Sequence, residues 1–345
     1  MNVEPKVTVL MPVYNEEKYL PESIESILSQ TFKNFDFLII DDGSTDNSEK
    51  IIRSYNDSRI QILLNGKNIG IVKTLNKGLK LSKGKYIVRM DADDVSLPER
   101  LEKQITYMEE NPETGVLGCN IRNVDKNLNF ISENLRPITH YQNLWKLLYK
   151  TNMMHPTVVF RKSVLSKNGY NYNSKFKRCE DYELWSRLAY VTVIEQIPDI
   201  LVMRRHHEGA ITKWDSLKVS QVTYSISGIN INRLFSNKMD SNRIDNLVSY
   251  LNGSYNDSER WWSNVCYDLF EMYILFCSKN IITRDDINWI AKDWLKLLVN
   301  IPLKYRMMAL LKCFNLKTVF GYRYFIPVIL MLKIVAFELK NILKK

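Results

Sequence analysis

The chain has 345 residues, of which 45% are hydrophobic and 25% charged, and its formal net charge is +10. This composition excludes a disordered chain and predicts one large or two unequal globular domains. The five cysteines are scattered, with no Cys-x-x-Cys pair, which argues against a disulfide framework or a structural zinc site. The N-terminus also lacks the basic-then-apolar order of a signal peptide, so we expect a cytoplasmic protein.

Apolar runs and helical patterns alternate along the first part of the chain. Near-continuous apolar runs predict buried strands at residues 7–13, 35–41, 59–64, 85–90 and 115–119. Apolar residues at helical spacing predict helices that begin near Leu20 and Leu101, the second preceded by Ser96 and Glu99 at capping-box spacing. Strands and helices in this order predict an α/β fold with a mainly parallel sheet.

Three polar clusters follow predicted strands. They are Tyr14–Asn15, Asp41–Asp42 and the acids Asp91, Asp93 and Asp94. Ligands of parallel α/β sheets bind beyond the carboxyl ends of the strands, so the three clusters should converge on one edge.

Each acidic cluster has a structural alternative to a ligand-binding role. The stretch DDGSTDNS could form only a turn and a helix cap, but that does not account for two paired carboxylates at a strand end. One of them could accept the imide N–H of uracil. The stretch DADD could be a solvated acidic turn, or it could hold Mg²⁺ or Mn²⁺ shared with substrate phosphates.

Two further segments carry candidate catalytic groups. Glu180 and Asp181 should open a helix, where acids are common because they complement its dipole; either could also serve as a general base. The stretch RRHHEGAIT places His206 and His207 among arginines, either as a plain basic loop or as a contact for phosphate or metal.

Together these motifs resemble family 2 glycosyltransferases that build bacterial cell-surface polysaccharide. The resemblance rests on the order and spacing of PVYNEEKYLPESIESILSQTF, DDGSTDNS, NIGIVKTLNKGL, YIVRMDADD, HPTVVFRK, EDYELW and RRHH. It implies a catalytic domain of the glycosyltransferase A-type fold over residues 1–215, in which a Rossmann-like nucleotide half is continuous with an acceptor half. It also implies metal-dependent, inverting transfer of a hexose or N-acetylhexosamine from a nucleotide-sugar, with Mn²⁺ or Mg²⁺ as cofactor.

The resemblance also implies roles for individual residues. Pro12, Tyr14 and Asp42 resemble the positions that bind the base, Asp91 resembles the ribose or sugar contact, and Asp93 resembles the metal-binding acid.

Asp181 resembles the catalytic base, with Glu180 beside it as the competing candidate. His206 resembles a histidine that reaches the metal-bound diphosphate. Met203 stands where a tyrosine is common, however, and the spacing to Thr212 is one residue longer, so His207 could take that role.

From about residue 216 the pattern changes to helices, and we expect a smaller helical region over 216–345. Its last 45 residues hold nine basic side chains and one acid, and the apolar run 325–337 is too short to span a membrane. This segment could rest on the anionic inner face of the cell membrane, or it could be a buried helix. The seven tryptophans lie among aliphatic residues, which does not indicate nucleic-acid binding.

The predicted function is therefore transfer of a sugar, with a UDP-sugar as the expected donor, to a glycan or a lipid-linked saccharide. A phospho-acceptor signalling domain also has paired acids at a strand end, but they follow its first strand and such a domain gives Asp181 no role. An inactive, nucleotide-binding scaffold subunit of the same fold is the remaining alternative.

Overall fold

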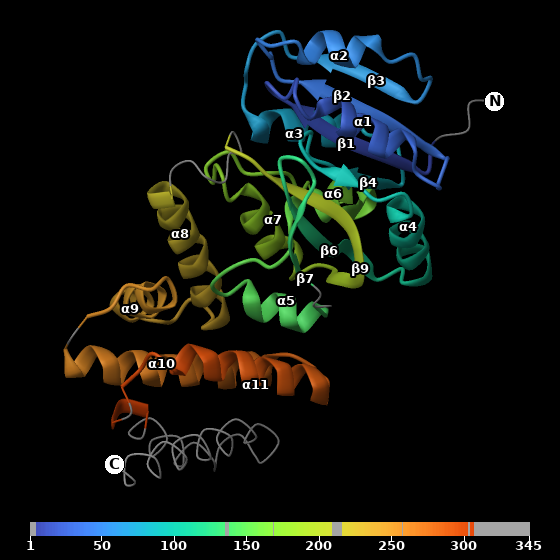
Figure 1. The fold of residues 1–345 in the computed structure, drawn as a ribbon. Coiled ribbons are helices and arrows are strands. Elements are labelled where there is room, and N and C mark those ends of the chain that lie inside the picture. Colours follow the sequence, from blue (N-terminus) through green and yellow to red (C-terminus); the bar gives the residue numbers. More distant parts are fainter. Residues whose placement is uncertain are drawn as a thin grey trace. The chain divides into compact units, whose positions relative to one another are not determined.

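The computed structural model describes residues 5–134, 138–167, 169–208, 216–256, 258–302 and 304–306. The chain forms two compact units (Figure 1). The first comprises residues 1–143 and 151–222, and the second comprises 144–150 and 223–345. The catalytic and membrane-associated roles predicted for 1–215 and 216–345 stay predictions.

The first unit is built on one nine-stranded sheet with the order β3-β2-β1-β4-β8-β6-β9-β5, and β7 pairs with β6. The strands are β1 (Val7–Val13), β2 (Phe35–Asp41), β3 (Ile60–Leu64), β4 (Tyr86–Arg89), β5 (Val95–Ser96), β6 (Thr114–Asp125), β7 (Phe130–Asn134), β8 (Val159–Arg161) and β9 (Val193–His206). Strands β3, β2, β1 and β4 run parallel, as do β6 and β9. The pairings of β8, β5–β9 and β6–β7 are antiparallel.

Helices surround this sheet and bury both of its faces. They are α1 (Leu20–Leu28), α2 (Ser48–Ser54), α3 (Ile71–Leu81), α4 (Arg100–Glu110), α5 (His140–Lys146), α6 (Lys162–Lys167) and α7 (Glu180–Leu188), with a 3-10 turn at His155–Thr157. Alternate residues of β1, such as Val9 and Met11, share a core with α1 and α4. Leu10 lies against Gly78 of α3 on the other face. The continuous apolar run of β1 thus reflects a strand covered on both sides.

The capping box expected at Ser96 does not form. Helix α4 begins at Arg100, and its N-cap residue Glu99 makes no side-chain cap. Ser96 instead belongs to β5, where its N–H donates to Ser26 Oγ at 3.0 Å. The helix receives a cap from elsewhere in the chain, because Leu101 N–H donates to Gln30 Oε1 at 3.0 Å.

The five predicted strands are present, whereas β5, β7, β8 and β9 were not predicted. Strand β9 has no simple pattern because its pairing with β6 shifts register around Pro198, which has no N–H to donate to a sheet. Asn120 Nδ2 bonds to the Pro198 carbonyl at 2.8 Å and so satisfies a polar group at the irregularity. The prediction of an α/β fold with a mainly parallel sheet is confirmed.

The second unit is helical in its described residues, with most of α8 (Ser216–Leu234), then α9 (Ser241–Leu251), α10 (Glu259–Lys279) and α11 (Arg284–Leu298). The segment 144–150 joins this unit through a buried carboxylate on α11. Trp145 Nε1 and Lys146 Nζ donate to Asp293 at 3.0 and 2.6 Å, and the Tyr149 hydroxyl also donates to it. Burial raises the Asp293 pKa, but these hydrogen bonds outweigh that effect and lower it below its usual value.

Among the described residues, no helix is both long enough and apolar enough to cross a bilayer. The run 325–337, for which membrane contact was predicted, lies outside the described residues.

Gly43 is a position where the fold requires glycine. Its φ is +74°, and an added Cβ would lie 2.4 Å from the Lys67 carbonyl carbon. Gly43→Ala should therefore cost roughly 3 kcal/mol of unfolding free energy, about 1 from the left-handed backbone and the rest from the clash.

Gly66 is the matched control, because its φ is +70° and nothing lies within 4 Å of an added Cβ. Gly66→Ala should cost only about 1 kcal/mol in the same urea titration. Equal costs for the two variants would contradict the close approach of Gly43 to residues 67–68.

Candidate active site

Hydrogen bonds tie together the loops that follow β1 and β2. Asn15 N–H donates to Ser44 Oγ at 3.0 Å, and Thr45 N–H donates to Asn15 Oδ1 at 2.7 Å. Glu17 N–H donates to Asp46 Oδ2 at 3.0 Å. Two of the three predicted polar clusters therefore meet at the carboxyl edge of the parallel strands.

The predicted base-binding residues Pro12 and Tyr14 lie at this edge in different environments. Pro12 is buried in β1 opposite Ile40 of β2. Tyr14 follows the strand and has 44% of its surface exposed, which leaves its ring free to stack on a planar ligand. Their roles in nucleotide binding stay predictions.

Asp42 is buried and fixes the loop that precedes α3. Its Oδ1 accepts hydrogen bonds from Asn65 Nδ2 at 2.9 Å and from Ile69 N–H at 3.0 Å, and its Oδ2 accepts one from Gly70 N–H at 2.9 Å. A carboxylate has about four acceptor positions, so about one remains for a uracil N–H. The first role of Asp42 in this structure is thus to hold the loop.

Asp41 has more unused hydrogen-bonding capacity than Asp42. Its Oδ2 accepts from the N–H groups of Gly43 and Ser44, each at 3.1 Å. Its Oδ1 is buried and has no hydrogen-bond partner among the described residues. A buried acceptor without a partner is costly, which makes Asp41 a second candidate for a ligand N–H.

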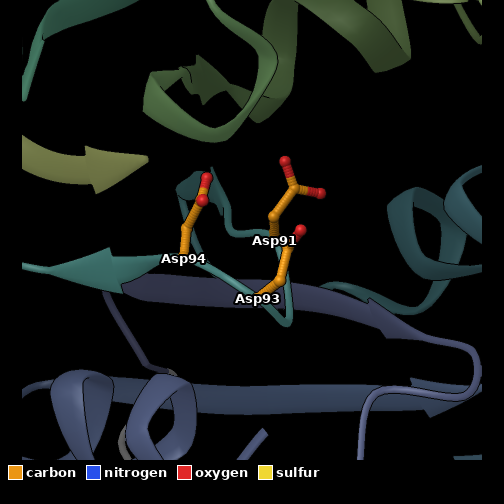
Figure 2. A group of neighbouring side chains, drawn as sticks. All are labelled: Asp91, Asp93 and Asp94. Carbon is orange, nitrogen blue, oxygen red and sulfur yellow. The ribbon is translucent and has the colours of Figure 1, made fainter. Parts of the chain in front are cut away.

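The third cluster lies on the loop between β4 and β5. Asp91, Asp93 and Asp94 each offer a carboxylate oxygen, and these three oxygens lie within 4.8 Å of one another (Figure 2). Burial raises the pKa of Asp94 well above its usual value, and the charges of Asp93 and Asp91 raise it further. Burial also raises the pKa of Asp91, against the opposing charge of Arg89. Oxygen donors at this spacing fit a hard divalent cation such as Mg²⁺ or Mn²⁺.

Two buried arginines hold this acidic loop. Arg89, at the end of β4, forms an ion pair with Asp91. Arg205, near the end of β9, donates from its backbone N–H to Asp94 Oδ1 and from Nε to the Asp93 carbonyl, both at 2.9 Å. The guanidinium of Arg205 also pairs with Glu22 of α1.

The two adjacent histidines point to different partners. His206 Nε2 lies 2.9 Å from Asn123 Oδ1, whereas His207 Nε2 lies 3.0 Å from Asp93 Oδ2. The His207 ring also packs against Tyr19. The prediction named His206 as the metal or diphosphate ligand, with His207 as the alternative. The geometry favours the alternative, because His207, directly after the end of β9, contacts an acid of the loop, whereas His206 contacts Asn123 of β6.

Glu16 is a site residue that sequence reasoning missed. Burial, together with the charges of Asp93 and Asp91, raises its pKa to about 8. A fourth carboxyl group therefore faces the acidic loop, and its electrostatic repulsion also favours a cation there. The motif PVYNEE contains the residue, but no spacing rule distinguished Glu16 from Glu17.

The predicted base lies in the first turn of α7. Burial and, to a smaller extent, the charge of Glu180 together raise the Asp181 pKa from 3.8 to about 7, against the opposing effect of the Tyr182 N–H, which lies 2.7 Å from Asp181 Oδ1. Burial therefore outweighs the dipole of α7, which favours the ionised carboxylate at the start of a helix. Glu180 is only 8% exposed, and its Oε2 has no hydrogen-bond partner among the described residues.

A buried aromatic cluster lies beside the base. His155 Nε2 lies 2.7 Å from the Tyr172 hydroxyl, and the His155 ring packs edge-on against Trp185 of α7. Burial raises the Tyr172 pKa and lowers the His155 pKa, so both side chains are neutral near pH 7. Arg89 lowers the pKa of Tyr172, Asp181 and Glu180, which puts its charge near all three groups. Sequence analysis had noted the segment around His155 without assigning it a role.

The family model described as Glycosyl transferase family 2 matches residues 8–169. The chain is 39% identical over 189 residues to an uncharacterized glycosyltransferase of Methanocaldococcus jannaschii, a match covering 53% of this chain and 64% of the relative. It is 34% identical over 226 residues to the O-antigen biosynthesis glycosyltransferase WbnJ of Escherichia coli, covering 64% of this chain and 79% of WbnJ. Its fold is similar to that of S. aureus TarS 1–349 in complex with UDP-GlcNAc, with a TM-score of 0.56, 19% identity and coverage of 94% and 89%.

The sheet and the acidic edge thus belong to a glycosyltransferase of the A-type fold. The chain is a member of glycosyl transferase family 2, and it is an enzyme of that class.

The three hydrogen bonds to Asp42 lead to a prediction about stability and binding. Asp42→Asn replaces one acceptor oxygen with an NH₂ group that faces N–H donors, so it should cost about 1–3 kcal/mol of unfolding free energy. If Asp42 also accepts the uracil imide, UDP affinity should fall by a similar amount in calorimetry on the folded variant.

Asp57→Asn is the control, because among the described residues the Asp57 carboxylate pairs with neighbouring Arg59 alone, and Asp57 follows the C-terminal end of α2. It should leave UDP binding unchanged. Parental stability of Asp42→Asn would mean that the loop does not depend on this carboxylate.

Proposed function

We propose that the chain transfers a sugar from a UDP-sugar to a saccharide or a lipid-linked saccharide, with inversion at the anomeric carbon. The proposal rests on one observation: polar groups from several elements gather at one edge of the sheet. They come from the acidic loop, the ends of β1 and β2 and the first turn of α7. Arg89 connects these parts, because it is paired with Asp91 and its charge also acts on Asp181.

A divalent cation, Mn²⁺ or Mg²⁺, would be held by Asp93 with Asp91, and His207 would contact the same group. When bound, such an ion neutralises charge on the diphosphate leaving group. Asp94 is less suited as a ligand, because it already accepts the Arg205 N–H and is 2% exposed. Its negative charge would still favour a cation at this position.

Asp181 would remove the proton from the acceptor hydroxyl while the hydroxyl oxygen bonds to the anomeric carbon and the bond to the UDP oxygen breaks. A pKa of about 7 suits a general base, since the group is ionised in part at neutral pH and still binds a proton well. Asp181 is more accessible than Glu180, which favours Asp181 as the group that meets the acceptor. His155 and Tyr172 would act as positioning residues through their packing on α7.

The proposed setting is cell-surface polysaccharide synthesis, supported by relatives such as the O-antigen glycosyltransferase of Escherichia coli. The chain would act in the cytoplasm, at the inner face of the membrane if residues 325–337 contact lipid. An anionic membrane and the glycan acceptor would then be its partners, and no nucleic acid would be involved.

The test of this proposal is a panel of nucleotide-sugars with Mn²⁺, scored by release of free nucleotide. A UDP-sugar should be turned over, chelator should abolish turnover, and Mn²⁺ or Mg²⁺ should restore it in the parent but not in Asp93→Ala. Intact UDP binding with no turnover of any donor would favour the inactive-scaffold alternative. Full activity in excess chelator would reject the role of the metal.

A second prediction concerns the base. Asp181→Asn should lower transfer by about 10²–10⁴-fold, the usual range for loss of an acid–base group, with UDP binding near the parental value. In the parent, kcat/KM should rise as pH increases through about 7, because only the ionised carboxylate accepts a proton. The variant should lack this rise.

The matched variant Glu180→Gln separates the two neighbouring acids. It should retain most activity and still show the pH dependence. If Glu180→Gln is inactive while Asp181→Asn is active, the base is Glu180; if both are active, the proposed mechanism is wrong.

The unfolding free energy gives an independent check on the Asp181 pKa. Because folding raises this pKa, the parent should lose stability as the pH rises through about 7. Asp181→Asn should lack this loss of stability.

A further inference from the structure

An open polar cavity lies at the opposite edge of the parallel sheet from the candidate active site. Its volume is about 700 Å³, and it is lined by residues that precede β1, β2 and β4 and that begin α6. Five basic side chains line it: Lys6, Lys83, Lys85, Arg161 and Lys162. Ligands of parallel sheets normally bind at the carboxyl edge, so the transfer reaction does not account for a basic cavity at the amino edge.

The backbone that carries these lysines is fixed by hydrogen bonds. Thr8 Oγ1 is fully buried in β1 and accepts the N–H groups of Lys83 and Gly84 at 3.1 and 2.9 Å. Lys162 N–H donates to the Lys85 carbonyl at 3.0 Å. The positive charges are therefore brought together by the sheet and not by a mobile loop.

The positive charge of the cavity is only partly neutralised. Glu109 pairs with Lys6 at 3.3 Å and with Lys85 at 2.8 Å. Lys83 and Lys162 have no ion pair with any residue that the structure describes. Asp36 lies near enough for Lys83 to lower its pKa, yet burial outweighs this effect and the Asp36 pKa is raised.

Arg161 adds a further positive charge, and it has no acidic partner in the described part of the chain. Its guanidinium donates to the Tyr86 hydroxyl at 3.0 Å and to the carbonyl oxygens of Thr114, Met108 and Asn111 at 3.2, 2.7 and 3.2 Å. All four acceptors are neutral. The guanidinium is thus satisfied in hydrogen bonding while its charge remains available to the cavity.

We propose that this basic cavity binds the phosphate groups of an anionic ligand. Lysine ammonium groups bind phosphate as point charges, and the hydroxyl-bearing residues Ser163 and Ser166 in the lining add donors. The volume is in the usual range of small-molecule sites. The phosphate could belong to a free phosphorylated compound or to a phospholipid headgroup, which share this chemistry.

The first measurement is calorimetric titration of pyrophosphate into the full chain with EDTA and without donor, so that metal-dependent binding at the acidic edge is absent. Binding should weaken with added salt because the contacts are ionic. Lys83→Ala/Lys162→Ala should weaken it about ten-fold, because each ion pair of a solvent-accessible lysine contributes only modestly in water. Lys83→Gln/Lys162→Gln should behave alike, which guards against a folding defect in the alanine variant.

Lys50→Ala/Lys175→Ala is the matched control, because both lysines are exposed, lie outside the cavity lining and remove the same net charge. It should bind pyrophosphate as the parent does. A parallel experiment compares sedimentation with vesicles of phosphatidylglycerol and of phosphatidylcholine.

If the parent binds pyrophosphate and the cavity variants do not, the ligand is a soluble phosphorylated compound. Binding only to phosphatidylglycerol vesicles, again lost in the cavity variants, supports a lipid headgroup. Binding of neither probe, or binding equal in the cavity and control variants, overturns the proposal. These readouts need no sugar transfer, so their failure is distinct from failure of the proposed enzymatic function.

Discussion

The candidate active site depends on the electrostatic balance around the loop between β4 and β5. Three carboxylates crowd this loop, and burial together with mutual repulsion would disfavour it without compensation. Arg89 of β4 pairs with Asp91, and Arg205 of β9 donates to the Asp94 carboxylate and to the Asp93 carbonyl of the same loop. The remaining negative charge, which also raises the pKa of Glu16, suits the loop to hold a cation and a diphosphate.

The parts of this edge differ in how firmly they are held. Asp42 uses both carboxylate oxygens to fix the loop before α3, while Asp41 keeps one buried oxygen without a partner among the described residues. Tyr14 is half exposed at the same edge. A binding site benefits from such a rigid frame with a few unsatisfied or exposed groups. The conformational entropy of the frame is lost during folding, so it does not weaken ligand binding.

The sequence predicted the parallel half of the sheet and the acidic loop well, because buried parallel strands are continuous apolar runs and their polar ends are easily seen. It did not predict β9, whose pattern is interrupted by Pro198 and by register shifts. It named His206 before His207 for the ligand contact, whereas His207 is the ring that lies against Asp93, because the direction of each ring depends on how the end of β9 packs. Nor did it predict the Asp181 pKa, which depends on burial among residues distant in the sequence.

The position of β9 has a consequence for the order in which the protein matures during synthesis. The acidic loop is complete by residue 94, whereas Arg205 and His207, which contact it, are translated more than a hundred residues later. A nascent chain that ends before β9 therefore exposes β5 and β6 without their partner strand and holds the acidic loop without Arg205. Unpaired strand edges are prone to aggregation, so the emerging chain should depend on chaperone protection until β9 has left the ribosome.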